Sequence, residues 1–365
     1  MHQTPSLTYA GAGVIPAGGP LSGLLGWVNR TLSFRQDLGA PALGIGHYAN
    51  VLRIGDNLGL AISTDSVGSK VLVAELLGKY DTLGIDCIAM NANDVLCVGA
   101  EPIALVDYIA VQEARADVLE QLGRGLYEGA RQANITIPGG ELAQLPEVVQ
   151  GAHPGTGLDL VGTCVGIGAL DRLIVGQDLT PGDVVLGLES SGIHSNGLTL
   201  ARKVLFDTAG YRPDEHLQEF GRTVGEELLE PTRIYVRPVW QMLAERIPIH
   251  GLYHITGDGL LNLARGENAV GFDLEWLPEP QPIFDVIRRR GGISAPEMYR
   301  VFNMGVGFCL VLPETAVGDA QRVAAAHGLT AHVLGITIAD TRRRVWLRPV
   351  GLVGEGEVFA PLDAV

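Results

Sequence analysis

The chain has 365 residues, of which 47% are apolar and 18% are charged, which excludes a disordered chain and a small domain without a proper core. Its formal net charge of −15 disfavours non-specific binding to a nucleic-acid polymer, because an acidic surface repels a phosphate backbone. Gly and Pro interrupt every apolar stretch of the length needed to cross a bilayer, so no membrane span is expected. A chain of this length predicts about two domains.

The amino-terminal region and the cysteines indicate the compartment. The first 29 residues contain no Asp, Glu, Lys or Arg, a composition that an export signal can share. A signal peptide needs a basic start and a compact apolar stretch, whereas Gly and Pro interrupt residues 10–28 repeatedly. The four cysteines form no CxxC pair and stand in apolar runs, so we expect reduced core thiols in a cytoplasmic protein. They are Cys87, Cys97, Cys164 and Cys309.

Alternating helices and strands predict a mixed α/β (α+β) fold. Residues 50–54 and 59–63 are typical of a hairpin whose turn lies at residues 55–58. Apolar periodicity then predicts helices 69–77, 82–98 and 117–133 and strands 103–111, 135–138 and 158–167.

The second half of the chain repeats this style. We expect strand 184–188, helices 198–206 and 232–245, strand 307–312 and helix 316–327. A Pro-Gly-Asp turn at 181–183 lies near the expected boundary, and we place the division at Gly168. The predicted domains are therefore 1–168 and 169–365, with mixed sheets packed by helices in both.

The segment 63–70, STDSVGSK, places an acid, a glycine turn and a lysine directly after an apolar strand. Asp65 at the mouth of the strand suits a hard cation such as Mg²⁺. Gly68 permits a tight turn, and a helix beginning near Ser69 directs its free N–H groups toward the same place as the Lys70 ammonium. This arrangement predicts an anion site, although the GxxxxGK[ST] spacing is missing; a solvated turn that caps a helix is the alternative.

The expected helix 82–98 is apolar on nearly every side, which indicates that it is buried. Asn91 and Asp94 are three residues apart and share one face, with Asp86 upstream of them. Burying an unpartnered carboxylate costs several kcal/mol, on the order of the stability of a small domain. Either a bound metal or an ordinary salt bridge or cap would meet this cost.

A third acid follows another predicted strand. Gly139, Gly140 and Glu141 come immediately after residues 134–138, so a carboxylate again stands behind a flexible glycine pair. We therefore expect Asp65, Asp94 and Glu141 to be ligands of one or more Mg²⁺ ions that bridge nucleotide phosphates.

Two loops of the second half are typical of anion or polar-substrate sites. Residues 190–197 combine hydroxyls, an amide, an imidazole and two glycines before a helix, and residues 256–259 form a similar loop. His194 is the best candidate for a general acid or base, because its ordinary pKa lies near neutral pH. The alternative is that His194 only orders its own loop. The expected substrate-binding residues are Ser191, His194, Ser195, Asn196, Thr256 and Gly257.

Seven segments, in this order between about Tyr9 and Ile338, carry a family resemblance: TDSVGSK, KYDTLGIDCIAMNANDVLCVGAEPIALVDYIA, PGGE, ESSGIHSNGLTLARKVL, EPTRIYVRPV, HITGDGLLNL and PEMYRVFNMGVGF. Together they resemble aminoimidazole ribonucleotide synthetase, also called phosphoribosylformylglycinamidine cyclo-ligase. So many ordered segments are far more specific than any one motif. The resemblance implies a dimeric enzyme of purine synthesis, with an N-terminal domain that binds ATP and Mg²⁺ and dimerises, and a C-terminal domain that binds substrate.

The resemblance also implies a mechanism. ATP phosphorylates the formyl amide oxygen of formylglycinamidine ribonucleotide, the amidine nitrogen closes the ring, and ADP and phosphate are released. Lys70, Asp94 and His194 are the expected catalytic residues. The residues expected around ATP and Mg²⁺ are Asp65, Ser66, Gly68, Ser69, Lys70, Asn91, Asp94, Gly139, Gly140, Glu141 and His47.

The chain departs from the usual family pattern at several places. Asp258 stands where glycine is commoner, and an acid there would repel phosphate. The glycine-rich lid is replaced by GIGHYANVL, in which His47 and Tyr48 are expected to contact phosphate or base, unless His47 is an ordinary core residue. The arm TYAGAGVIPAGG lacks the usual charges, and LAQLPE after Glu141 leaves the number of metal ions open.

Three other classes stay open beside this assignment. A sister enzyme of the same ATP-using superfamily could phosphorylate selenide, thiamine phosphate or a hydrogenase-maturation partner, but no cysteine precedes Cys87 and the chain ends in Val365. A non-catalytic or differently specific relative is a second class. A structural protein without any ligand is least expected, because the buried acids would then lack a purpose.

Overall fold

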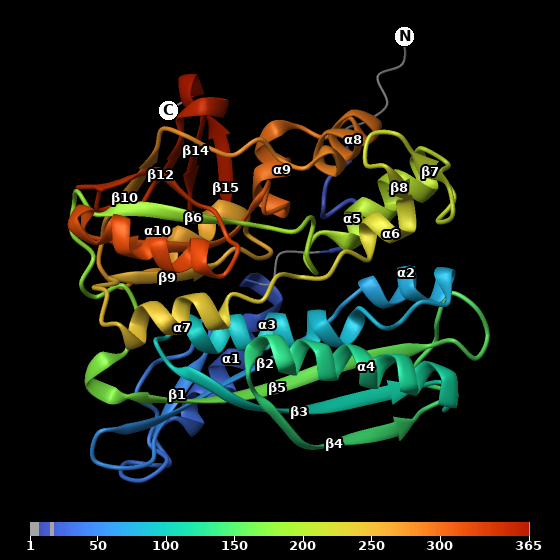
Figure 1. Cartoon of the computed structure of the whole chain (residues 1–365), viewed down its shortest axis with the longest axis horizontal. Helices are drawn as coiled ribbons and strands as arrows, with labels where there is room; N and C mark the ends of the chain where they lie inside the picture. Colours follow the sequence, from blue (N-terminus) through green and yellow to red (C-terminus); the bar gives the residue numbers. More distant parts are fainter. Residues whose placement is uncertain (1–6, 15–17, 365) are drawn as a thin grey trace.

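The computed structural model describes residues 7–14 and 18–364, which fold around two large sheets, with a third sheet of only two strands, β7-β8 (Figure 1). The five-stranded sheet has the order β1-β2-β5-β3-β4, and the eight-stranded sheet has the order β15-β14-β13-β10-β12-β6-β11-β9. Helices α3 and α4 cover one face of the five-stranded sheet, and α3 also contacts β9 of the other sheet. The two sheets thus belong to two units joined through helix α3.

The first unit alternates helices and strands as expected. Its elements are α1 (Gly18–Thr31), β1 (Asn50–Arg53), β2 (Leu58–Ser66), α2 (Lys70–Leu77), α3 (Leu83–Cys97), β3 (Glu101–Val111), α4 (Ala116–Ala133), β4 (Thr136–Gln144) and β5 (Leu158–Ala169).

The second unit begins with β6 and contains shorter elements. These are β6 (Val184–Glu189), α5 (Leu198–Arg202), β7 (His216–Leu217), β8 (Arg222–Thr223), α6 (Val224–Leu228), α7 (Val236–Ala244), β9 (Gly251–His254), β10 (Gly271–Leu274), α8 (Pro282–Gly291), α9 (Ala295–Val301), β11 (Val306–Leu312), α10 (Val317–Ala326), β12 (Ala331–Ile338), β13 (Val345–Leu347), β14 (Leu352–Glu355) and β15 (Val358–Pro361). A π-helix, η2 (Lys203–Thr208), continues α5, and a 3₁₀ helix, η3 (Gly259–Arg265), follows β9.

The predicted mixed α/β organisation is confirmed, and so are the hairpin β1–β2 and the buried helix α3. Three boundaries differ. Strand β4 runs on to Gln144, so the glycine pair and Glu141 lie inside a strand rather than after it. Helix α7 begins only at Val236, because the N–H groups of Thr232 and Tyr235 bond the buried side chains of Asp86 and Asn93 on α3 instead of taking part in a helix. The predicted helix 198–206 widens into the π-helix η2.

The register of the first sheet decides which side chains share a face. Asp65 pairs with Gly162, Gly162 with Asp107, and Asp107 with Gly140, so these four residues lie in one row on the face covered by helices. The opposite face carries exposed apolar side chains that no described helix covers. Among them are Leu58, Val106, Tyr108 and Ile167.

Close approach of α3 and α4 builds the core of the first unit. A Cβ at Gly84 would lie 2.1 Å from the Leu126 backbone nitrogen, and a Cβ at Gly125 would lie 2.3 Å from the Asp81 carbonyl oxygen. Both glycines are therefore required by contact rather than by backbone conformation. All four cysteines are buried free thiols whose pKa values burial raises, which confirms their expected place in the core. No helix among the described residues is long and apolar enough to span a membrane.

Candidate active site

A pocket of about 250 Å³ lies where the Asp65 loop meets the start of helix α5. Ser69 Oγ and Thr199 Oγ1 are 2.9 Å apart, so the two loops are joined by a side-chain hydrogen bond. Four of the predicted ATP residues and two predicted substrate residues therefore face one cavity, whereas Asn91 and Asp94 do not line it. It is lined by Tyr9, Asp65, Ser66, Val67, Gly68, Ser69, Met90, Ser195, Asn196, Gly197, Leu198 and Thr199.

Asp65, Asn91 and Asp94 are brought together by strand β2 and helix α3. Asn91 Nδ2 donates to the Asp65 carbonyl oxygen at 3.2 Å and to the Cys87 carbonyl oxygen at 2.9 Å. Its Oδ1 is buried without a hydrogen-bond partner among the described residues. Burial, with a further contribution from the Asp94 charge, raises the pKa of Asp65 to about 6. A bound cation would relieve this repulsion.

His254 contacts Asp94, although the sequence alone predicts no role for this histidine. Its Nδ1 lies 2.9 Å from Asp94 Oδ1, and its side chain is only 1% exposed. Burial raises the pKa of Asp94, an effect that the His254 hydrogen bond partly offsets. A histidine before the 256–259 loop was the available signal, but only the fold shows that strand β9 ends against helix α3.

The predicted metal site of three carboxylates is wrong in its third member. Glu141 follows Gly140, and successive residues of a strand point to opposite faces, so Glu141 lies on the face away from Asp65. Strand β4 is also three strands from β2, about 14 Å at the usual spacing. Within residues 7–14 and 18–364, no three His, Cys, Asp or Glu side chains are arranged to hold a metal ion. Gly139 and Gly140, on the same exposed stretch of β4, do not line the pocket either.

Two carboxylates and an amide oxygen nevertheless fit Mg²⁺. This ion is usually held by one or two carboxylates, with phosphate oxygens and water completing its octahedron. Asp65 and Asp94 supply the carboxylates, and the unpartnered Oδ1 of Asn91 supplies a neutral oxygen. The donor set is all oxygen, as a hard cation requires.

Lys70 does not supply a cation to the pocket, contrary to its predicted role. Its side chain is completely buried, with Nζ 2.9 Å from Asp86 Oδ1 and 2.5 Å from the Glu230 carbonyl oxygen. Asp86 Oδ1 also accepts hydrogen bonds from the Thr232 N–H and from the Thr232 and Ser195 hydroxyls. For Asp86 the salt-bridge alternative is therefore confirmed. Lys70 and Asp86 join α2 and α3 to the second unit.

His194 lies behind the pocket rather than in its lining. Its Nε2 accepts a hydrogen bond from the Ser191 N–H at 3.1 Å and lies 3.5 Å from the Arg233 nitrogen. Burial above all, and then the neighbouring His254, Lys70 and Arg233, hold the pKa of His194 well below 6.5. The neutral ring orders the 190–197 loop, and its buried Nδ1 has no partner among the described residues.

The remaining substrate candidates occupy three different settings. Ser195 and Asn196 line the pocket, whereas the Ser191 hydroxyl is bonded to the Pro231 carbonyl oxygen at 2.5 Å. Thr256 is held through its backbone N–H, which bonds Asn262 Oδ1 at 2.8 Å, and neither Thr256 nor Gly257 lines the pocket.

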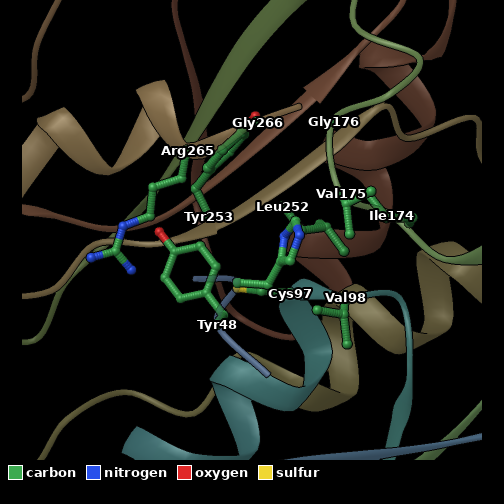
Figure 2. A pocket seen from close by; sticks show the side chains of 11 residues that line it. Tyr48, Cys97, Val98, Ile174, Val175, Gly176, Leu252, Tyr253, Arg265 and Gly266 are labelled. Atoms are coloured by element: carbon green, nitrogen blue, oxygen red, sulfur yellow. The ribbon is translucent and has the colours of Figure 1, made fainter. Parts of the chain in front are cut away.

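Residues 44–52, which were expected to stand in place of a glycine-rich lid, are docked on the second unit. His47 Nε2 lies 3.6 Å from Glu267 Oε1, and Arg265 lies over the Tyr48 ring at 5.0 Å, as Figure 2 shows for Tyr48 and Arg265. Arg265 also pairs with Asp258 at 2.8 Å, which neutralises the unusual acid. His47 lines a separate cavity of about 20 Å³, room for a single water molecule, and not the Asp65 pocket.

Family models match both units. Residues 46–168 match the model described as AIR synthase related protein, N-terminal domain, and residues 180–348 match the corresponding C-terminal domain. The fold and the site thus define a two-domain AIR synthase related protein.

Curated relatives narrow this class. The chain is 50% identical over 292 residues to the phosphoribosylformylglycinamidine cyclo-ligase of Methanothermobacter thermautotrophicus, covering 80% of this chain and 83% of the relative. It is 48% identical over 342 residues to the phosphoribosylformylglycinamidine cyclo-ligase of Thermococcus kodakarensis, covering 93% of this chain and 98% of the relative. The chain belongs to the phosphoribosylformylglycinamidine cyclo-ligase family, which confirms the resemblance.

Solved structures share the fold at low identity. A thiamine-monophosphate kinase from Stenotrophomonas maltophilia has a TM-score of 0.58 at 20% identity, covering 87% of this chain and 93% of that one. T. maritima PurL complexed with ATP has a TM-score of 0.56 at 15% identity, covering 88% of this chain and 47% of that one. These likenesses support the two-unit architecture alone.

Proposed function

We propose that this protein is an ATP-dependent ligase of purine biosynthesis, which converts formylglycinamidine ribonucleotide into aminoimidazole ribonucleotide and releases ADP and phosphate. The observation that carries the proposal is the identity of about half the residues to cyclo-ligases over nearly the whole chain. The pocket between the Asp65 loop and helix α5 supports it, because the Asp65 carboxylate and neutral polar groups of both units share one cavity there.

The reaction transfers a phosphoryl group and then forms a ring. The formyl amide oxygen attacks the γ-phosphorus of ATP, the bond to the ADP oxygen breaks, and a phosphate ester becomes the leaving group. The amidine nitrogen forms a bond to the activated carbon, the carbon–oxygen bond breaks to release phosphate, and the nitrogen loses a proton. Positioning and charge neutralisation are the main catalytic contributions that such a phosphoryl transfer requires.

Asp65, Asp94 and Asn91 would hold Mg²⁺ through their oxygen atoms. When bound, the ion supplies positive charge that neutralises the transferring phosphoryl group. Ser66, Gly68 and Ser69 would then lie beside the phosphates, since they line the same cavity. The buried Lys70–Asp86 pair would contribute by fixing helix α2 against α3 and not as a phosphate cation.

Ser195 and Asn196 are proposed to bind the ribonucleotide substrate from the second unit. His194 would act through its Nδ1, because Nε2 already accepts a hydrogen bond from the loop backbone. A substrate oxygen that reaches this buried N–H would satisfy it. His194 therefore remains the candidate for orienting the departing phosphate oxygen through a hydrogen bond from Nδ1.

The assembly and the compartment complete the proposal. We infer a homodimer formed through the uncovered face of the five-stranded sheet, where Leu58, Val106, Tyr108 and Ile167 are all at least 36% exposed. A division near residue 168 gives domains 1–168 and 169–365, the first binding ATP and the second binding the ribonucleotide. Four buried free thiols fit the reducing cytoplasm.

A coupled assay tests the function directly. Purified protein, ATP, Mg²⁺ and formylglycinamidine ribonucleotide should yield aminoimidazole ribonucleotide, with one ADP for each ring closed. ADP release should depend on the amidine substrate. ATP binding without ring closure would contradict the proposal and assign a non-catalytic or differently specific member of the superfamily instead.

A further inference from the structure

We propose that His254 is a positioning residue, which holds the Asp94 carboxylate in place from across the junction of the two units. The inference rests on the proposed function, because Asp94 is the carboxylate expected beside the ATP phosphates. His254 ends strand β9 of the second unit, whereas Asp94 lies on helix α3 of the first. Their 2.9 Å contact is a bond between side chains 160 residues apart in the chain.

The hydrogen-bond network determines which nitrogen of His254 carries the proton. Asn93 Oδ1 accepts from the Tyr235 N–H at 2.9 Å, so the other amide atom must be the nitrogen, which donates to the Arg233 carbonyl oxygen at 3.0 Å. That same Nδ2 lies 3.4 Å from His254 Nε2 and presents an N–H to it. Nε2 is therefore the acceptor, and the neutral ring carries its hydrogen on Nδ1, directed at Asp94 Oδ1.

The backbone of His254 is anchored as well as its ring. The Tyr48 hydroxyl donates to the His254 carbonyl oxygen at 2.9 Å, and β9 pairs His254 with Phe308 of β11. Asn93 is 0% exposed, so the group that orients the ring is itself immobilised by packing. The imidazole thus has one orientation and one tautomer.

This arrangement leaves the two oxygens of Asp94 with different tasks. Oδ1 accepts the His254 N–H, whereas Oδ2 has no hydrogen-bond partner among the described residues, and we assign Oδ2 to the ligand. Hydrogen bonds to a ligating carboxylate from outer residues typically contribute about 10–100-fold to metal affinity or activity. His254 would therefore tune the site without contacting ATP or the ribonucleotide.

Three substitutions of His254 separate the effect of its hydrogen bond to Asp94 from the effect of its side-chain volume. In His254→Asn the side-chain amide nitrogen can take the place of Nδ1, so the donor to Asp94 is kept. In His254→Gln the amide reaches toward the Nε2 position instead, and His254→Leu has no donor. The affinity for Mn²⁺ in the presence of ATP can be measured from the electron paramagnetic resonance signal of free Mn²⁺. This affinity should fall about 10–100-fold in the Gln and Leu variants but only slightly in the Asn variant.

Steady-state kinetics give a second readout. In the Gln and Leu variants kcat should fall while the KM for the ribonucleotide stays close to that of the wild type, because the substrate pocket is untouched. Adding His254→Leu to Asp94→Asn should cause no further loss of Mn²⁺ binding, because the carboxylate that it positions is already gone.

The matched control is His250, which precedes the same strand and lies 2.8 Å from Asp183, an aspartate that does not line the pocket. His250→Leu should leave Mn²⁺ affinity and kcat unchanged. Unchanged Mn²⁺ affinity in His254→Leu, or equal losses in the Asn and Leu variants, would overturn the proposal. If His254→Leu fails to fold, the Asn and Gln pair decides between the same outcomes. Wild-type protein that binds Mn²⁺ and ATP without closing the ring would refute the proposed function alone, since the Mn²⁺ readout needs no turnover.

Discussion

Lys70 and Asp86 form an ion pair in which neither side chain is exposed, with Nζ 2.9 Å from Oδ1. Burial lowers the pKa of Lys70, and the charge of Asp86 opposes that effect. Because the Asp86 carboxylate also accepts bonds from Thr232 and Ser195, the pair ties the two units together. A residue that looks like a phosphate ligand is thus a structural cation.

Removing one member of this pair should destabilise the protein strongly. Lys70→Met leaves a buried carboxylate without its cation, and we expect the free energy of unfolding to fall by about 3–5 kcal/mol. The double variant Lys70→Met with Asp86→Asn should lose less free energy of unfolding, because no buried charge is then left without a partner. Arg124→Met, which breaks an exposed pair with Glu120, should cost less than about 1 kcal/mol. Denaturant unfolding measures all three, and equal losses in Lys70→Met and Arg124→Met would contradict the expectation.

Asp94→Asn should abolish ATP turnover while the fold survives. The asparagine oxygen can still accept the His254 N–H, but the negative charge that binds Mg²⁺ is lost. We expect kcat to fall by at least about 100-fold, as when other preorganised electrostatic groups are removed. ADP release and circular dichroism are the measurements. Asp258→Asn, which alters an exposed ion pair, should retain turnover, and near-normal rates in Asp94→Asn would exclude Asp94 as a ligand.

Stability without ligands should depend on the ionisation of Asp65. Its pKa of about 6 in the folded protein exceeds the ordinary value of 3.8, so the native state retains a proton that the unfolded chain has released. Stability should therefore decrease as pH rises from about 4 to about 6, by roughly 2 kcal/mol, and stay level above that range. Denaturant unfolding at several pH values measures this slope.

Asp65→Asn should reduce that slope and make the ligand-free protein more stable at pH 7, while carboxyls such as Asp94, whose pKa is also raised, keep a part of it. The exposed Asp56→Asn serves as the control and should leave the slope unchanged. A slope of the same size in the wild type and in Asp65→Asn would show that other groups cause it.

Two glycines of helix α4 should respond to alanine in opposite directions. A Cβ at Gly125 meets the Asp81 carbonyl oxygen at 2.3 Å, whereas a Cβ at Gly123 meets nothing within 4 Å. Gly125→Ala should lower the free energy of unfolding by about 1–3 kcal/mol, because α4 must move away from α3. Gly123→Ala should raise it by about 0.5–1 kcal/mol through its helix propensity. Thermal or denaturant unfolding checks both, and a destabilised Gly123→Ala would show that propensity does not decide at this position.

A charge on the uncovered sheet face should dissociate the proposed dimer. Val106 is 43% exposed among other apolar side chains, and Val106→Glu would place a carboxylate in the interface. Sedimentation velocity should then report a monomer where the wild type is a dimer. Val148→Glu changes a 77% exposed residue of a loop and should leave the dimer intact. A dimer that persists in Val106→Glu would place the interface elsewhere.

Much of the architecture could be predicted from local sequence. The spacing of apolar residues identifies strand β2 and helices α3 and α4. These signals depend only on neighbouring residues. The sequence also grouped Asp65, at the end of a strand, with Asn91 and Asp94, in a helix that is apolar all round, and in the structure Asn91 bonds the Asp65 carbonyl oxygen. Helices α8 and α9 were not predicted, since their short amphipathic patterns are weaker signals.

Tertiary structure alone decided the assignment of individual side chains. Glu141 could not be excluded from the metal site until the register across three strands showed which face it occupies. Lys70 could not be removed from the phosphate site, nor His254 connected to Asp94, while their partners lay 16 and 160 residues away in the chain. Local sequence encodes periodicity and turns because those depend on neighbouring residues. Which groups pair in a buried site depends on distant segments that meet only when the core is formed.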